Sequence, residues 1–343
     1  MQNSALLFTP LNIGDVRVKN RIVMPPMCMY KVKNDSGLPR CFHKLHYGAR
    51  ALGGVGLIIV EATAVEPRGR IPPKDLGLWS DEQTAAHKEL VKECAKYGAV
   101  MAIQLAHAGR KSECDSEPIA PSAVKFNSAY KTPKQMSAQD IEEVKEAFVS
   151  AAVRAQEAGY EIIELHAAHG YLLNEFLSPG INKREDGYGG SFENRTRLLK
   201  EILLAVKQAT SVPVGIRISA DSWVAGDWDV ADSVRLAKQL EELGAAFIHV
   251  SAGGLFESVD EAPKFAPLYQ AGYAKAVKEA VNIPVIAVGL ITRASEGEAL
   301  LLGGACDLVA YGRELLRNPN FAFSAMSIFK EKELIEDAYL RAF

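Results

Sequence analysis

The stretch Ile163-Glu164-Leu165-His166-Ala167-Ala168-His169-Gly170-Tyr171 reads as a short buried strand that ends in two histidines and a tyrosine. Two imidazoles and a phenol at one strand end can hold a carbonyl oxygen and deliver a proton. These groups could reduce a polarised double bond, provided that another group brings the hydride.

Seven further apolar, β-branched runs lie along the chain on either side of this strand, separated by segments with helical periodicity. Most of the runs lack period-2 alternation, which is typical of parallel strands covered on both faces. The eight predicted strands are Arg21–Pro25, Val55–Glu61, Ala99–Leu105, Glu161–His166, Pro213–Ile218, Ala246–Ser251, Pro284–Gly289 and Asp307–Gly312. Strand and helix alternating eight times predict an α/β fold, a (β/α)8 TIM barrel.

Three of the intervening helices have an apolar stripe and a recognisable start. Ser137 and Asp140 form a capping-box pattern ahead of a stripe that begins at Ile141. We expect a second helix after Asn194 and a third after Asp229, which is a good N-cap residue.

No linker or change of composition divides residues 1–343, so we expect one domain. A plain barrel needs ~250 residues. The surplus lies in an N-terminal lead-in, a long loop around Ala106–Gln135 and a C-terminal tail.

Composition narrows the class of protein. A net charge of -3 gives no reason to expect nucleic acid or an anionic membrane as partner. We find no apolar run of membrane-spanning length and no secretory signal at the N-terminus. The five cysteines are scattered without a C-x-x-C pair, which favours reduced thiols in a cytoplasm.

Catalytic groups of a TIM barrel lie at the carboxyl ends of its strands, and the loops after the last two strands usually bind phosphate. Gly289, Gly312 and Arg313 lie in those loops. Each glycine alone could simply turn the chain. Two glycines with an attached arginine, which can pair with a phosphate bidentately, favour a phosphate-bearing ligand.

Two polar side chains interrupt apolar strands. The Arg217 guanidinium needs an anion there, supplied either by a structural ion pair or by the negatively charged N1 edge of a reduced flavin. Gln104 ends the third strand and could bond the polar edge of a planar ring or only a neighbouring loop.

Metal and dinucleotide motifs are absent from the sequence. His166 and His169 lack a clear third ligand, so we expect no metal. The run Gly53-Gly54-Val55-Gly56 precedes its strand, whereas a dinucleotide fingerprint must follow one. We therefore expect no separate nicotinamide domain.

Over essentially its whole length the sequence resembles the Old Yellow Enzyme family of FMN-dependent ene-reductases. The most specific segment runs from His166 through Pro179 to Arg195. The resemblance is also carried by Leu7–Pro10, Lys19–Met24, Gln104–Lys111 and Gly312–Leu315. Pro26-Met27-Cys28-Met29-Tyr30 and the ending Tyr339–Phe343 resemble the bacterial branch called thermophilic-like.

The resemblance implies non-covalent FMN as cofactor and NAD(P)H as electron donor. The residues expected at FMN are Pro25, Pro26, Met27, Cys28, Ala62, Gln104, His166, Arg217, Gly253, Gly289, Gly312 and Arg313. The residues expected at the substrate are Tyr30, Lys111, His166, His169, Tyr171 and Arg341. Pro25 and Ala252 replace residues that are commonly polar or small in the family, so contacts to the flavin can be lost there.

The implied reaction is ping-pong. NAD(P)H reduces FMN and leaves, and an α,β-unsaturated carbonyl compound, an enone or enal, then takes its place. His166 and His169 would bond the carbonyl oxygen, hydride would pass from flavin N5 to the β-carbon, and Tyr171 would protonate the α-carbon. An alternative electrophile is a nitro compound or an enoyl thioester. A metal-dependent aldolase and a catalytically silent flavin-binding protein remain open as rivals.

The C-terminal tail places two aromatic residues around Arg341, a composition typical of an interface anchor. Together with the branch resemblance, this predicts a homodimer or homotetramer in which Arg341 enters the substrate pocket of a second subunit. The alternative is that the tail packs on its own barrel.

Overall fold

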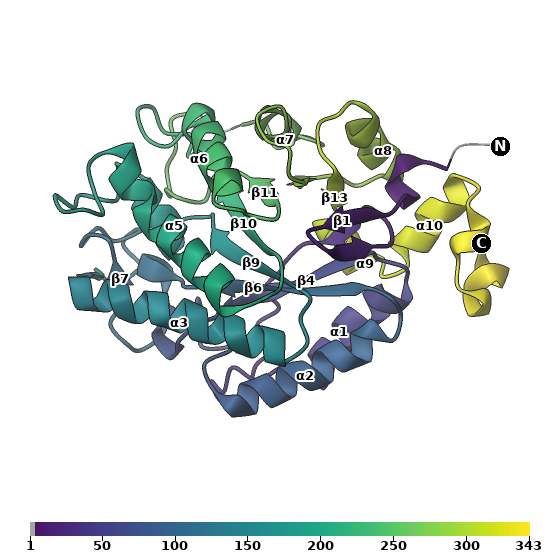
Figure 1. The fold of residues 1–343 in the computed structure, drawn as a ribbon, viewed down its shortest axis with the longest axis horizontal. Coiled ribbons are helices and arrows are strands. Elements are labelled where there is room, and N and C mark those ends of the chain that lie inside the picture. The colour runs from purple at the N-terminus through teal and green to yellow at the C-terminus, as the bar shows by residue number, and fades with distance from the viewer. Residues whose placement is uncertain (1–3, 262) are drawn as a thin grey trace.

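A closed ring of parallel strands forms the centre of the computed structural model, which describes residues 4–261 and 263–343. In chain order, the strands are β3 (Ile22–Met24), β4 (Leu57–Ala64), β6 (Val100–Ala106), β9 (Ile162–Ala167), β10 (Val214–Ser219), β11 (Ile248–Ser251), β12 (Val285–Ala287) and β13 (Leu308–Ala310). Each strand pairs with the next, and β13 pairs with β3, so the ring closes. The predicted TIM barrel is confirmed (Figure 1).

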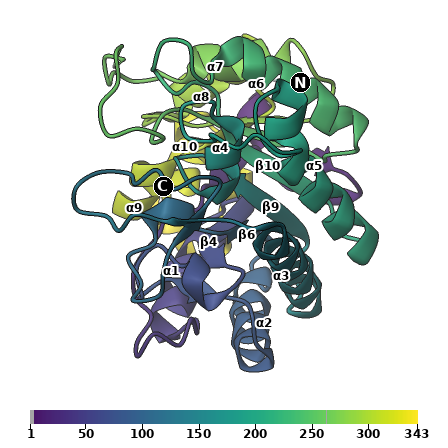
Figure 2. The ribbon, with the colours of Figure 1, turned by 90° about the vertical axis from the view of Figure 1, so that its left-hand side faces the viewer.

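Helices surround the ring, as Figures 1 and 2 show. They are α1 (Cys41–Leu52), α2 (Asp81–Ala95), α3 (Ala138–Glu157), α4 (Leu172–Leu177), α5 (Phe192–Ala209), α6 (Val230–Glu242), α7 (Ala271–Lys278), α8 (Ala294–Leu302), α9 (Gly312–Arg317) and α10 (Phe321–Ile328). None of the helices within the described ranges is both long enough and apolar enough to cross a bilayer.

The expected helix starts are right at two positions and wrong at one. Ser137 and Asp140 form the capping box of α3, and the Asp229 side chain caps α6. The helix expected after Asn194, α5, begins at Phe192 instead, because the Ser191 hydroxyl accepts a hydrogen bond from the backbone N–H of Asn194. Ser191 therefore ends the preceding loop and starts the helix.

The barrel interior is apolar at the amino ends of the strands. Side chains such as Leu57, Ile162 and Phe247 form this cluster. Ile13 and Val18 join it from the hairpin of β1 (Leu11–Ile13) and β2 (Val16–Val18), so the lead-in closes this end of the barrel. Polar groups are thereby left to the carboxyl ends, where a ligand can reach them.

Strand β4 differs from the expected Val55–Glu61. It runs to Ala64, and its register against β6 shifts between Val60 and Thr63. Glu61 and Ala62 therefore lie in a bulge within the strand rather than at its end. Bulges re-aim side chains, and this one lies at the active-site end of the barrel.

The long loop after β6 is partly ordered by its own strands. β7 (Ile119–Ala120) pairs with β8 (Lys134–Gln135), and a 3-10 turn spans Gly109–Lys111. A further short strand, β5 (Leu76–Gly77), pairs with the end of β4. These pairings hold the loops at the carboxyl end of the barrel.

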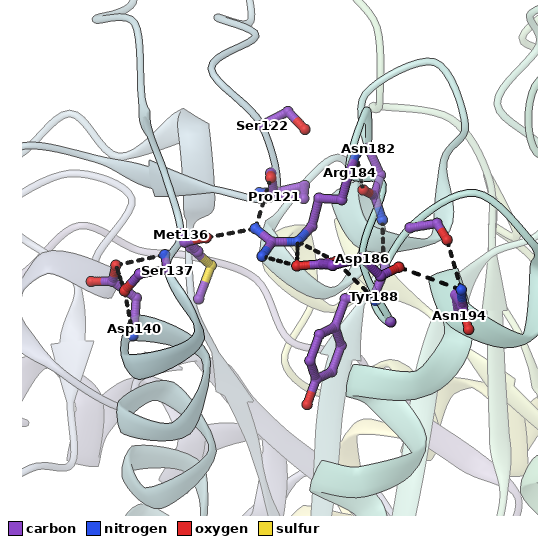
Figure 3. Close-up of polar contacts among 12 residues, drawn as sticks. Pro121, Ser122, Met136, Ser137, Asp140, Asn182, Arg184, Asp186, Tyr188 and Asn194 are labelled. Atoms are coloured by element: carbon purple, nitrogen blue, oxygen red, sulfur yellow. Dashed lines mark hydrogen bonds and ion pairs between the residues drawn. The ribbon is translucent and has the colours of Figure 1, made fainter.

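Arg184 joins the loop after α4 to the residues that directly follow β7 and β8 (Figure 3). Its guanidinium donates to the carbonyl oxygens of Pro121 at 3.2 Å and Met136 at 2.6 Å, and it pairs with Asp186. The amide of Asn182, two residues earlier, donates to the carbonyl of Tyr188. The segment from Asn182 to Arg195, which is part of the motif that carries the family resemblance, thus holds the two loops together.

Candidate active site

His166, His169 and Tyr171 lie together after β9, as the sequence predicts. The ring centroids of His166 and His169 are 5.3 Å apart, and those of His166 and Tyr171 are 4.9 Å apart. Both pairs meet edge to face. Three hydrogen-bonding rings therefore converge on one small region at the carboxyl end of the barrel.

The protonation of His166 can be assigned from its contacts. The backbone N–H of Ala168 donates to His166 Nδ1 at 3.3 Å, so this nitrogen carries no proton. Burial, followed by the positive charge of Arg217, holds the pKa of His166 well below its ordinary value. The ring is thus neutral at pH 7, and its Nε2–H is the donor available to a ligand.

His169 is held by two serines from neighbouring strands. Its backbone N–H donates to Ser219 Oγ at 2.9 Å, and its Nε2 lies 2.8 Å from Ser251 Oγ. The backbone φ of His169 is +59°, a left-handed conformation that non-glycine residues rarely adopt. These bonds stabilise the strained turn, and Nδ1 is the nitrogen left for a ligand.

Tyr171 shares an apolar surface with Cys28. Both side chains pack against the small cluster of Ala62, Ile71, Ala106 and Ala108. Burial raises the pKa of the Tyr171 phenol and that of the Cys28 thiol, so both stay protonated at neutral pH. A protonated phenol is the form that can donate a proton.

Tyr30 lies at the open side of this group. Its side chain is 46% exposed and its φ is +54°. The residue before it, Met29, donates its backbone N–H to the buried Glu61 carboxylate at 2.6 Å. The bulge in β4 thereby fixes the segment that carries Cys28 and Tyr30.

Lys111 bridges two loops next to Tyr171. Its Nζ donates to the carbonyl oxygens of His169 at 2.9 Å and Gly254 at 2.5 Å, and lies 5.6 Å from the centre of the Tyr171 ring. Burial, followed by the charge of Arg110, lowers the pKa of Lys111 to about 8. Lys111 thus ties the turn at His169 to the loop at Gly254.

The predicted phosphate loops line one cavity of about 350 Å³. Arg217, Gly289, Gly312 and Arg313 all border it. Gly289 has a φ of +127°, and a Cβ there would lie 2.9 Å from Gln270 Cβ, so a larger residue does not fit. The cavity therefore brings together the two glycines and Arg313 expected at a phosphate and Arg217 expected at the edge of a flavin.

Arg217 and Gln104 lie inside the barrel next to the histidines. Arg217 is the register partner of His166 and is 7% exposed, and its buried Nε has no hydrogen-bond partner among the described residues. Gln104 donates to Glu164 at 2.7 Å. An unpartnered guanidinium N–H beside a cavity fits an anionic or acceptor-rich ligand such as FMN.

The remaining expected cofactor residues lie around the same end of the barrel. Pro25 and Met27 approach Gly312, whose added Cβ would lie 3.6 Å from Pro25 Cγ and from Met27 Sδ. Gly253 has a φ of +73°, and a Cβ there would meet the Trp223 ring at 2.2 Å. Pro26 and Ala62 are buried, as is Ala252.

Arg341 lies apart from these residues. It belongs to the 3-10 segment Asp337–Ala342 and is exposed, and it forms no ion pair with the described residues. Tyr339 and Phe343 pack on Phe323 of α10 in the same chain, with ring centroids 5.7 and 6.2 Å apart. The aromatic anchors thus dock on their own chain, and Arg341 between them is exposed.

Several residues of the site were not predicted. Glu61, Glu164 and His249 are buried, ionisable and in contact with predicted residues or their neighbours. Their signal in the sequence is the one that drew attention to Arg217, a charged or polar side chain inside an apolar strand. Among the described residues, no group of three or more His, Cys, Asp or Glu side chains could hold a metal ion.

Comparison with known proteins gives consistent matches over the chain. Residues 6–331 match the model of the NADH:flavin oxidoreductase / NADH oxidase family. The chain is 50% identical over 320 residues to an NADPH dehydrogenase of Geobacillus sp. (strain WCH70), covering 93% of each chain. It is 47% identical to an NADPH dehydrogenase of Bacillus subtilis (strain 168), covering 93% of this chain and 94% of the relative.

Solved structures share the fold. Morphinone reductase superposes with a TM-score of 0.82 at 30% identity, covering 95% of this chain and 90% of that chain. A 2-naphthoyl-CoA reductase superposes with a TM-score of 0.88 at 22% identity, covering 96% of this chain and 53% of that one. The second likeness concerns the fold alone.

Proposed function

The chain belongs to the NADH:flavin oxidoreductase / NADH oxidase family, and we propose that it reduces the carbon–carbon double bond of α,β-unsaturated carbonyl compounds. Family membership and the NADPH dehydrogenase relatives make it an NAD(P)H-dependent flavin oxidoreductase with FMN as cofactor and NADPH as electron donor. The resemblance to the Old Yellow Enzyme family is thereby confirmed. The substrate class and the order of steps are the proposal.

The observation that carries the proposal is the convergence of His166, His169 and Tyr171 beside Arg217. Arg217, Gly289, Gly312 and Arg313 would hold FMN, with the phosphate in the cavity and the guanidinium of Arg217 near the ring. FMN held by these residues would supply the hydride chemistry, with NADPH as the source of the hydride and the β-carbon of the alkene as its acceptor.

The protein's own groups bind the carbonyl and supply the proton. His166 Nε2–H and His169 Nδ1 lie on the free sides of their rings and would hold the substrate oxygen, where negative charge develops. Their neutrality favours hydrogen bonding over proton loss. The Tyr171 phenol, kept protonated by burial, would protonate the α-carbon.

We propose that NADPH and the alkene use this one site in turn, which makes the reaction ping-pong. The test is anaerobic titration of the purified holoprotein with NADPH, followed by a panel of enones and enals. We expect NADPH to bleach the flavin spectrum and the enones to restore it. Nitro compounds and enoyl thioesters belong in the same panel, and restoration by these alone would contradict the enone assignment.

We further propose that Arg341 acts in a second subunit. Tyr339 and Phe343 fix the tail on its own chain through Phe323, while Arg341 is exposed and has no ion-pair partner among the described residues. An anchored and exposed arginine is suited to enter a neighbouring molecule's pocket. The protein would then be a homodimer or homotetramer with shared sites.

We also propose a cytoplasmic location. All five cysteines are free thiols. Free thiols persist in a reducing compartment, which agrees with this location.

A further inference from the structure

A layer of polar side chains lies inside the barrel directly above its apolar floor. On four neighbouring strands, an apolar residue or glycine is followed two positions later by a polar one facing the same side. The pairs are Ala102 and Gln104, Ile162 and Glu164, Gly215 and Arg217, and Phe247 and His249. Gln104 and Arg217 are already assigned to the cofactor, whereas Glu164 and His249 have no assigned role.

Glu164 connects these groups. Its carboxylate, which is completely buried, accepts from Gln104 Nε2 at 2.7 Å and lies 2.7 Å from His249 Nδ1. His249 is on β11 and Glu164 on β9, so their contact crosses β10. Gly215 is the register partner of Glu164 and Arg217 is that of His249, so the contact runs diagonally across β10.

The contact fixes the orientation of the Gln104 amide. A carboxylate can only accept hydrogen bonds, so the amide nitrogen of Gln104 must face Glu164. The amide oxygen is therefore the end of Gln104 left free, and it accepts no hydrogen bond from the described residues. An acceptor in this place suits the N–H group on the pyrimidine edge of an isoalloxazine ring.

The same contact sets the state of His249. With the carboxylate as acceptor, His249 Nδ1 carries the proton. Burial, the main cause, and the nearby Arg217 lower the pKa of His249 despite the attraction of Glu164. The ring is thus neutral. Burial, the main cause, lowers the pKa of Arg217, and nearby Glu164 acts in the opposite direction.

We infer that Glu164 and His249 are positioning residues for FMN, which fix the Gln104 amide with its oxygen towards the ring and balance the charge of Arg217. This inference rests on the proposed function, because it assumes FMN in the site. Neither residue needs to touch the cofactor. Glu164 acts through Gln104 and Arg217, and His249 acts through Glu164.

The first test measures FMN affinity rather than turnover. FMN is removed, and the apoprotein is titrated with FMN while flavin fluorescence is followed. In Glu164→Gln the residue can offer either end of an amide to Gln104, so the orientation is no longer fixed. We expect the Kd for FMN to rise about tenfold or more, since a hydrogen bond to a charged group contributes about 1.5–3 kcal/mol.

A double-mutant cycle separates this role from general destabilisation. In a Gln104→Leu background the amide is absent, so Glu164→Gln should change the Kd much less than it does in the wild type. Equal, additive effects in both backgrounds would overturn the inference. So would a Glu164→Gln apoprotein that unfolds at the wild-type temperature and binds FMN with unchanged affinity.

If Glu164→Gln does not fold, a pair of His249 variants tests whether the contact between His249 and Glu164 affects FMN binding. His249→Asn keeps an N–H donor for Glu164 and should bind FMN within about twofold of the wild type, whereas His249→Leu should lose about tenfold. Equal affinities in the two variants would contradict the role. Exposed Glu157→Gln serves as the matched control.

The charge balance has a separate readout. Removing the negative charge of Glu164 should make the reduction potential of bound FMN more positive, because the reduced form carries more negative charge. An unchanged or more negative potential would contradict the charge-balancing part. A wild-type protein that binds no FMN would instead refute the proposed function.

Discussion

At Tyr171, burial and position together make a proton donor. The phenol lies 4.9 Å from the ring of His166, measured between centroids, and its pKa is raised by burial. We expect Tyr171→Phe to slow reoxidation by an enone roughly 10²- to 10⁴-fold, the usual contribution of general acid catalysis. Reduction by NADPH should stay close to the wild-type rate, because that step needs no proton from the phenol.

Stopped-flow measurement of the two half-reactions distinguishes the outcomes. A Tyr171→Phe protein with an unchanged reoxidation rate would mean that water or another group supplies the proton. His166→Ala is the informative comparison, since it should weaken the binding of phenols and enones instead.

Burial of Glu175 should make the free energy of unfolding of the protein depend on pH. It is completely buried in α4, accepts from the Arg110 backbone N–H at 2.9 Å, and its pKa is raised by burial to about 8. Between the unfolded pKa of about 4.3 and the folded value, the folded state holds a proton that the unfolded state has lost. The free energy of unfolding should therefore fall as pH rises through this window.

Urea unfolding at several pH values tests this expectation. Glu175→Gln keeps an oxygen for Arg110 and cannot ionise, so its stability should fall less than that of the wild type between pH 5 and pH 8. The exposed Glu157→Gln should follow the wild type. Parallel curves for all three proteins would show that Glu175 does not hold the proton.

Single residues at the site were predicted from the sequence where their chemistry or a motif revealed them. His166, His169, Tyr171 and Arg217 stand out because polar groups at or in a buried strand require a reason. Their partners did not stand out. Ser251 lies 82 residues from His169 in the chain, and no local pattern connects a serine to a histidine at that distance.

At the scale of elements, Arg184 determines how two loops meet. Its buried guanidinium donates to the carbonyls of Pro121 and Met136 and pairs with Asp186 (Figure 3). Arg184→Met leaves two buried carbonyl oxygens without these donors. We expect a loss of about 2–3 kcal/mol in the free energy of unfolding, measured by urea denaturation.

The neighbouring Lys183→Met is the control, because Lys183 is exposed. Equal stabilities of the two variants would show that the Arg184 contacts contribute nothing net. A loss confined to Arg184→Met would identify the motif after Pro179 as a structural clamp.

Element positions followed from the sequence because buried parallel strands are continuous apolar runs. The bulge in β4 did not, since the residues Glu61 and Ala62 continue the run and only pairing with β6 reveals the shift. The start of α5 was misplaced because both Ser191 and Asn194 are good capping residues. The hydrogen bond between them decides in favour of Ser191.

At the scale of the whole molecule, the barrel closes without help from the tail, which makes the tail available for assembly. The ring of strands is complete from β3 to β13, whereas Asp337–Ala342 lies outside it (Figure 1). From the sequence, we expect the aromatics of the tail to anchor it on a second subunit. They pack instead on Phe323 of the same chain, a contact that depends on the position of α10 and that no local pattern reveals.

The proposed role of Arg341 can be tested by exchanging subunits. Tyr171→Phe removes the acid from a subunit's own site, and Arg341→Ala removes the arginine that it would lend to its neighbour. In a mixed dimer with shared sites, the Tyr171→Phe subunit lends its intact Arg341 to the Arg341→Ala subunit, whose own Tyr171 is intact. One complete site results, so the activity of the mixture should exceed the sum of the separate variants. Native mass spectrometry establishes that exchange has occurred, and no recovery in exchanged dimers would place Arg341 in its own chain's site or outside any site.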